Sequence, residues 1–245
     1  MKNFKQSTIL IGPKAVGKSL LTSKFEEQHP DAYVLNADLL INMIAHKLNG
    51  TMELLESDKE FSEKVAKYKR DFDINDLSSY VYEMAKIMQY PNISDTSKQV
   101  ILQFWKTRLL ESALYKMNQP VFVDASADFG ACFNLSKDDQ DEVKSFLYMH
   151  ADTILSRHKS FLDQFGTIAY LKPGPTYHES KEERSHDTAN MLFLSNPDSY
   201  SKFASITISA KDLFVPKQNI MVPNIEKANQ LLSEIENHKN QSSFE

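Results

Sequence analysis

One stretch of the sequence decides the fold, STILIGPKAVGKSLL at residues 7–21. Within it, residues 12–19 match the pattern G-x-x-x-x-G-K-[ST], in which successive main-chain N–H groups form a nest for phosphate oxygens. Residues 8–11 before the pattern are apolar and partly β-branched, which predicts a short buried strand. Residues 18–28 after it predict a helix that presents its positive N-terminus to the same phosphates. A loop that cradles phosphate between a strand and a helix is therefore expected.

The loop supplies the first candidate site residues. Lys18 is expected to reach the β- and γ-phosphates, and the Ser19 hydroxyl to complete the coordination shell of a Mg²⁺ ion. Lys14 either adds charge to the loop or is a solvated lysine, and we favour the solvated lysine. The chain has only 6 glycines, and two of them stand at the positions that the pattern requires. The expected nucleotide-binding residues are Gly12, Pro13, Lys14, Ala15, Val16, Gly17, Lys18, Ser19 and Leu20.

Composition limits the class of protein. The chain has 245 residues, 41% hydrophobic and 25% charged, which is enough to bury a core. Its net charge is -5 without a long basic block, which disfavours nucleic acid as a main partner. The single cysteine, Cys132, excludes an intramolecular disulfide and suits a reducing compartment. No apolar run has the length of a membrane-spanning helix or a signal peptide. We expect a cytoplasmic protein with no membrane partner, and its oligomeric state stays open.

Alternating apolar and helical segments predict an α/β fold. Because the strands are separated by helices, they should form a parallel sheet covered on both faces. Five apolar runs predict the strands, at residues 8–11, 33–35, 121–123, 167–171 and 205–208. Residues 36–120, between the second and third runs, predict helices instead, at residues 39–48, 62–69, 74–88 and 97–115.

These elements predict one domain, residues 1–237, followed by a polar and frayed tail at residues 238–245. The helical stretch at residues 39–118 is predicted to be an insertion in that domain after the second strand. An insertion at this place is a candidate acceptor-binding or lid element.

Ligands of a parallel sheet bind beyond the carboxyl ends of its strands, so the residues there are further candidates. Asp38 follows the second strand and either caps the next helix or acts as a carboxylate near the γ-phosphate; the two roles are compatible. Asp124 follows the third strand and has the position of an acid that holds Mg²⁺, or it caps the next segment. Arg184, after the fourth strand, is the best candidate to neutralise charge in a transition state, unless it is a surface arginine; Arg157 is the second.

The order of these features resembles the shikimate kinase, gluconate kinase and nucleoside-monophosphate kinase group of P-loop phosphotransferases. The closest similarity is to shikimate kinase-like proteins of unassigned substrate. The resemblance implies a three-layer fold with parallel strands in the order 2-3-1-4-5, and ATP- and Mg²⁺-dependent transfer of the γ-phosphoryl group. It also implies that Asp38 binds the acceptor hydroxyls. The loop at residues 210–214 is implied to pack on adenine.

The chain also departs from that group. Asn36 stands where the group has a metal-linked acid, Ser195 stands where it has an arginine, and the insertion after the second strand is far longer. Shikimate is therefore disfavoured as the acceptor. In our first hypothesis the chain phosphorylates a hydroxyl of a small molecule or nucleotide, with Lys18, Asp38 and Arg184 as catalytic residues. Ser19 and Asp124 then hold the Mg²⁺.

Two alternatives to this hypothesis stay open. One is a nucleotide-binding NTPase or switch module without kinase activity, which the departures from the group motivate. The other is a kinase of the zeta-toxin type that acts on a nucleotide-sugar, because the long insertion leaves room for a large acceptor.

Overall fold

The computed structural model describes residues 4–125, 135–174, 201, 203–217 and 220–242. Cys132, Arg184 and Ser195 lie outside the described residues. Contacts within the chain divide it into two compact units. The first unit consists of Met1–Leu35, Gln119–Asn134 and Lys159–Glu245, and the second of Asn36–Asn118 and Leu135–His158.

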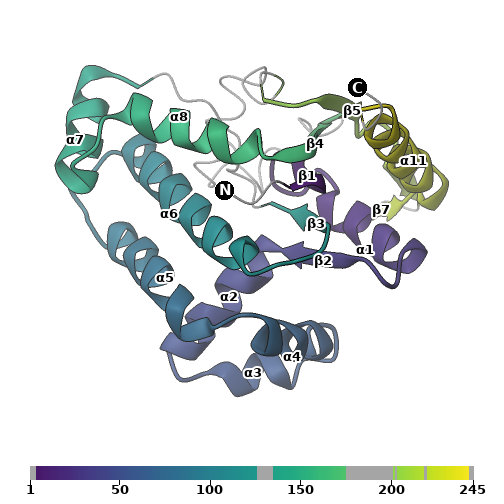
Figure 1. Ribbon diagram of the computed structural model, residues 1–245, viewed down its shortest axis with the longest axis horizontal. Helices are drawn as coiled ribbons and strands as arrows, with labels where there is room; N and C mark the ends of the chain where they lie inside the picture. Colours follow the sequence, from purple (N-terminus) through teal and green to yellow (C-terminus); the bar gives the residue numbers. More distant parts are fainter. Residues whose placement is uncertain (1–3, 126–134, 175–200, 202, 218–219, 243–245) are drawn as a thin grey trace. The chain divides into compact units, whose positions relative to one another are not determined.

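The first unit is built on a five-stranded sheet with the order β2-β3-β1-β4-β5 (Figure 1). Strand β1 is parallel to both β3 and β4, and β4 is parallel to β5. This order confirms the predicted α/β fold class. The strands are β1 Phe4–Ile11, β2 Tyr33–Asn36, β3 Val121–Asp124, β4 Phe165–Lys172 and β5 Ile206–Ser209.

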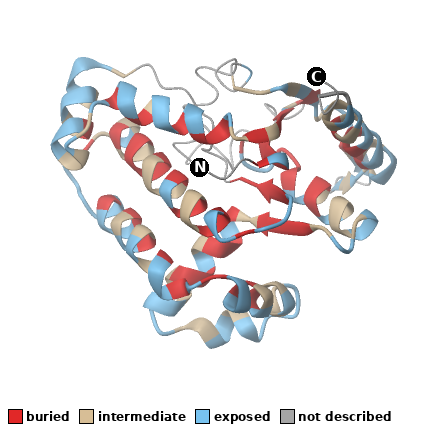
Figure 2. Ribbon diagram, viewed as in Figure 1, coloured by how far each residue is buried: buried red, intermediate tan, exposed pale blue. Residues whose placement is uncertain are grey.

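Both faces of the central strands are buried, as Figure 2 shows in red. On one face, Leu10 and Leu171 join a core cluster with side chains of α1 (Lys18–Gln28) and α11 (Ile225–Ser242). The alternate side chains of the same strands, such as Ile9 and Tyr170, are buried as well. A strand buried on both faces has to be apolar at nearly every position, which is why the central strands are recognisable as short apolar runs in the sequence. In the edge strand β5, Ile208 is the one buried residue.

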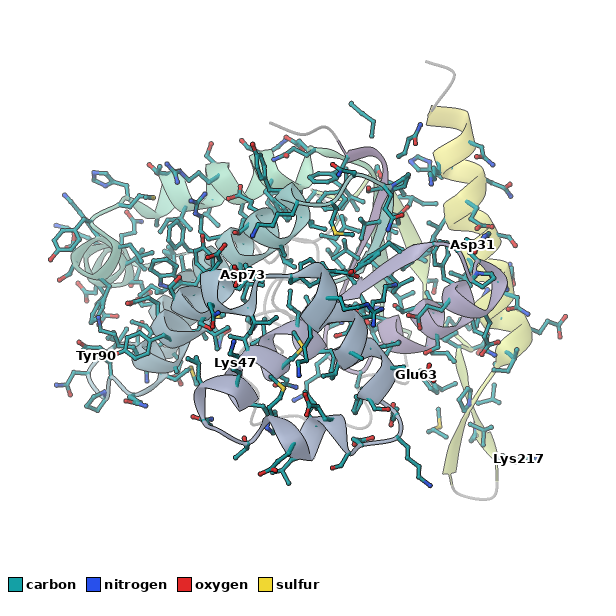
Figure 3. All side chains as sticks on the ribbon, turned by 60° about the horizontal axis from the view of Figure 1, so that its bottom comes forward. Asp31, Lys47, Glu63, Asp73, Tyr90 and Lys217 are labelled. Atoms are coloured by element: carbon teal, nitrogen blue, oxygen red, sulfur yellow. The ribbon has the colours of Figure 1, made fainter. Side chains whose placement is uncertain are left out.

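Two features at the end of the chain differ from the sequence-based expectation. Helix α11 runs through Ser242, so the first residues of the stretch expected to fray, 238–245, are helical. An antiparallel hairpin of β6 (Phe214–Lys217) and β7 (Ile220–Pro223) follows β5 and was not predicted. Lys217 stands at its end in Figure 3. The Pro residues in both short strands remove the usual pattern of a strand, which explains why the hairpin was missed.

The second unit is helical. The four helices predicted in the insertion are present, and the short α3 between them was not predicted because it buries no residue that would give it a pattern. The unit also takes in residues 135–158, beyond the predicted insertion of residues 39–118. No helix among the described residues is long and apolar enough to cross a membrane. The helices are α2 Ala37–Leu48, α3 Met52–Glu56, α4 Ser62–Asp71, α5 Ile74–Met88, α6 Asp95–Tyr115, α7 Lys137–Leu147 and α8 Ala151–Leu162, whose last turn belongs to the first unit.

A cluster of serines and one carboxylate joins the N-termini of α6 and α7. Ser136 caps α7 in a capping box with Asp139, and Ser94 caps α6. The Ser94 and Ser97 hydroxyls both donate to Asp139, so one carboxylate serves the caps of two helices. Burial raises the pKa of Asp139, but hydrogen bonds from Ser136, Ser94 and Ser97 outweigh this and leave the pKa lowered.

We expect Asp139→Asn to destabilise the protein at neutral pH by roughly 1 kcal/mol, the usual value of a lost helix cap. A lowered pKa means that the ionised Asp139 stabilises the fold above the pKa of the unfolded chain. This stabilisation is lost as the pH falls through the lower pKa of the folded chain. The difference in the free energy of unfolding between wild type and variant should therefore become smaller well below about pH 4. Urea unfolding at neutral pH and at the low pH measures this difference. Asp138→Asn, at the exposed neighbouring residue, is the matched control.

Candidate functional site

The phosphate loop has the backbone that its sequence pattern predicts. Gly17 is the N-cap of α1 with a φ of 109°, and Gly12 has a φ of 154°. The first helical hydrogen bond runs from the Leu21 N–H to the Gly17 carbonyl at 3.1 Å. Ala15 also has a positive φ, 57°, which costs energy in a residue with a Cβ. These turns let successive N–H groups of the loop point to one side.

Lys18 lies folded over this loop. Its Nζ donates to the Gly12 carbonyl at 2.9 Å and to the Pro13 carbonyl at 3.0 Å. The side chain is only 8% exposed. Since the ammonium group keeps its charge close to the main chain, Lys18 places a cation beside the N–H groups that the pattern assigns to phosphate.

Ser19 and Asp124 come together at the carboxyl end of the sheet. The Ser19 hydroxyl donates to the Asp124 carboxylate, with 3.3 Å between Oγ and Oδ2. Asp124 is the last residue of β3, pairs with Leu10 of β1 and is 4% exposed. Both side chains offer oxygen, which is the ligand that Mg²⁺ takes in nucleotide sites. The residues present thus fit a Mg²⁺ ion held by two protein groups and nucleotide phosphates.

Among the residues that the structure describes, no group of three or more His, Cys, Asp or Glu side chains is placed to hold a metal. A metal site made entirely of protein ligands is therefore not seen in that part of the chain. A Mg²⁺ ion in a phosphate-loop site needs fewer protein ligands, because phosphates and waters complete its shell.

The turn that carries Asp38 belongs to the second unit. The expectation that Asp38 caps the helix is wrong: the cap of α2 is Asn36, whose Oδ1 accepts from the Leu39 N–H at 2.8 Å. The Asn36 N–H donates to the hydroxyl of the buried Tyr68 at 2.8 Å, which fixes the start of the turn. Asp38 is exposed in the first turn of α2, where a negative charge suits the helix dipole.

The other predicted site residues are placed as follows. Lys14 and Ala15 are exposed, whereas Val16 is buried in the core cluster. Arg157 is exposed on α8 in the second unit, and Arg184 lies outside the described residues. Lys18, Ser19 and Asp124 are therefore the catalytic and metal-binding candidates that the structure brings together in one unit.

The segment after β5 packs on the phosphate loop, which the sequence did not indicate. Leu213 is fully buried, and a Cβ on Gly17 would lie 2.4 Å from its Cδ2 atom. The ring of Phe214 lies next to the same position, at 3.2 Å. The resemblance implied that residues 210–214 contact adenine. Nothing in the local sequence indicates their contact with Gly17, because the two segments are far apart in the chain and meet only in the folded protein.

Comparisons with known proteins add a limited similarity. No protein-family model and no curated protein matches the chain. Among solved structures, shikimate kinase from Aquifex aeolicus vf5 is similar over 94% of this chain and 96% of its own length, with 14% sequence identity and a TM-score of 0.43. The strand order and the phosphate loop, taken by themselves, give this chain the α/β fold of P-loop proteins.

We expect Gly17→Ala to destabilise the protein and abolish nucleotide binding, because the new Cβ meets Leu213 and the left-handed backbone disfavours alanine. The cost should be about 1–3 kcal/mol by urea unfolding. Ala15→Gly is the matched variant in the same loop. It removes strain at a positive φ, so its free energy of unfolding should stay within about 1 kcal/mol of wild type. Equal losses in both variants would contradict the assigned geometry of the loop.

Proposed function

We propose that this protein is a P-loop kinase that transfers the γ-phosphoryl group of ATP to a hydroxyl of a small molecule or nucleotide. One observation carries the proposal. The Lys18 ammonium lies on the Gly12 and Pro13 carbonyls, next to a helix whose second residue, Ser19, bonds to Asp124 at the end of β3. A cation, a nest of N–H groups and a hydroxyl–carboxylate pair are the parts that phosphoryl transfer uses.

Each residue of the first unit has a separate task in this proposal. The N–H groups of residues 12–19 bind the β-phosphate, and Lys18 holds negative charge on the transferring group. Ser19 and Asp124 hold a Mg²⁺ ion together with the phosphates. When bound, the ion neutralises phosphate charge and fixes the nucleotide. Little covalent chemistry is left to the protein, so positioning and charge stabilisation account for most of the rate.

The acceptor is assigned to the second unit. Asp38 would orient an acceptor hydroxyl or accept its proton, since it is an exposed carboxylate on a turn fixed by Asn36 and Tyr68. A fixed turn supports this role because a hydroxyl nucleophile has to be held in one geometry. Arg184 is retained as the group that neutralises charge in the transition state, on the basis of its place in the sequence.

A second function is favoured by one observation, a nucleotide-binding module without kinase activity. Asn36 stands where a metal-linked acid occurs in the resembled group, and its side-chain oxygen is used as the cap of α2. The proposed Mg²⁺ site then has one carboxylate fewer than the corresponding site of the resembled group. A module of this kind binds ATP and turns it over slowly or not at all, without a phosphorylated acceptor.

The test of the first function is transfer of label from γ-labelled ATP, with Mg²⁺, into a small-molecule cell extract. We expect a labelled product with wild type and a loss of at least about 100-fold for Lys18→Ala, the usual cost of removing one charge-stabilising donor. Asp38→Ala should lose transfer and keep ATP binding. Lys24→Ala, a lysine on the same helix outside the loop, is the matched control and should leave transfer unchanged.

The possible results separate the two functions. Undiminished transfer by Lys18→Ala rejects the kinase assignment. ATP binding without any labelled product favours the nucleotide-binding module, and so does release of labelled phosphate that does not depend on the extract.

The metal assignment gives a further prediction. Asp124→Asn and Ser19→Ala should each raise the Mg²⁺ concentration needed for half-maximal ATP binding, by about 10-fold or more, because each removes an oxygen ligand. Isothermal titration of ATP at several Mg²⁺ concentrations measures this. Affinity for ATP without Mg²⁺ should change far less, and an equal loss with and without the metal would remove both residues from the metal shell.

A further inference from the structure

The first unit holds a cavity near the amino ends of β1 and β3, whereas the phosphate loop follows the carboxyl end of β1. Its volume is about 730 Å³, within the usual range for small-molecule sites. Gln6 and Thr8 on β1 line it, while Gly12 follows the other end of the same strand. From Thr8, the lining residue of β1 nearer the loop, to Gly12 an extended chain covers about 13 Å, so the cavity and the phosphate loop are separate places along β1.

Stacked rings form one wall of the cavity. Phe122 of β3 stacks on Phe25 of α1 with 4.2 Å between ring centroids and 24° between planes. The imidazole of His29 continues this column, 4.6 Å from Phe25. All three rings line the cavity, but Phe122 is only 4% exposed and Phe25 lies between its two partners. The imidazole of His29, whose side chain is 41% exposed, is therefore the ring face that the column offers.

Polar contacts fix the opposite wall, which is formed by α11. His29 Nε2 pairs with Glu236 Oε1 at 2.5 Å, and Gln28 donates to Asn229 at 2.9 Å. These two contacts hold the end of α1 against α11, so the rim does not depend on apolar packing alone. Figure 3 labels Asp31 at the turn after α1, beside α11.

The lining polar groups favour an uncharged ligand. Gln6, Gln119 and Asn240 are exposed carboxamides, and each offers a donor and an acceptor to the cavity. The basic side chains in the lining, His29 and Lys239, already have interaction partners. Asp31 and Glu236 add negative charge. A phosphate group would therefore find little electrostatic attraction in this cavity, in contrast to the phosphate loop at the carboxyl end of β1.

We propose that this cavity binds a planar nitrogen heterocycle without phosphate, of the size of a nucleobase or nucleoside. Its ring face stacks on the imidazole of His29, which Phe25 and Phe122 support from behind, and its edge nitrogens and oxygens meet the carboxamides of the rim. The site is distinct from the proposed nucleotide site in position and in charge.

The test uses 2-aminopurine, a planar heterocycle whose fluorescence falls when it stacks on aromatic rings. The full chain is titrated in saturating ATP and Mg²⁺, and Lys18→Ala is titrated in parallel. We expect saturable quenching with both proteins. Phe25→Leu should weaken the affinity at least 10-fold. Gln119→Ala, at an exposed rim position where the fold is not at risk, should weaken it several-fold, and Lys24→Ala on α1 should leave it unchanged.

The phosphate-free character is tested with 2-aminopurine riboside and its 5′-monophosphate. The riboside should bind at least as tightly as the monophosphate. Tighter binding of the monophosphate overturns the assigned ligand class. Absence of saturable quenching, or affinity unaffected by both Phe25→Leu and Gln119→Ala, overturns the site. Because Lys18→Ala leaves the cavity intact, this proposal and the proposed kinase activity can fail independently.

Discussion

The close approach of the Leu213 side chain to Gly17 is the constraint on which the nucleotide site depends. At this residue the chain turns from loop to helix with a φ of 109°, and Leu213 fills the space where a Cβ would stand. Lys18 and Ser19 follow at once, so their directions are set by that turn. The segment after β5 is held against the same point. The left-handed turn at Gly17 thus joins the phosphate loop to the start of α1.

Parallel register supplies the second half of the site. The pairing of Leu10 with Asp124 brings the last residue of β3 level with the end of β1, just before the phosphate loop begins. The Ala125 N–H donates to the Leu10 carbonyl at 3.1 Å and continues this pairing past the strand. Asp124 therefore reaches Ser19 through two neighbouring strands that end together, although the residues are far apart in sequence. This is the physical reason that acids after strands are informative in α/β folds.

What the sequence predicted well is what local physics determines. The central strands are apolar because both faces are buried, and the glycines at 12 and 17 mark backbone that few other residues adopt. Helix α1 was predicted at its observed bounds because the loop pattern fixes where it begins. The hairpin of β6 and β7 has proline in short exposed strands, and α3 buries no residue, so neither gives a periodic signal.

Contacts between segments that are distant in the chain could not be predicted from the sequence. Leu213 against Gly17, the pair of His29 with Glu236 and the stacking of Phe25 on Phe122 each join residues from separate elements. Their residue types are ordinary in any globular protein, so no local pattern distinguishes them. The cap of α2 was predicted at Asp38 and is Asn36 for a different reason, since both residue types cap helices about equally well.

Because asparagine and aspartate cap helices about equally well, the residue type at position 36 affects the charge of the turn more than its structure. An asparagine at position 36 preserves the cap of α2 and the hydrogen bond to Tyr68, and so keeps the turn in place. It also removes a negative charge from the turn, and a neutral amide is a weaker Mg²⁺ ligand than a carboxylate. Under the proposed function, metal binding then falls to Ser19 and Asp124 in the first unit, and Asp38 is left to the acceptor alone.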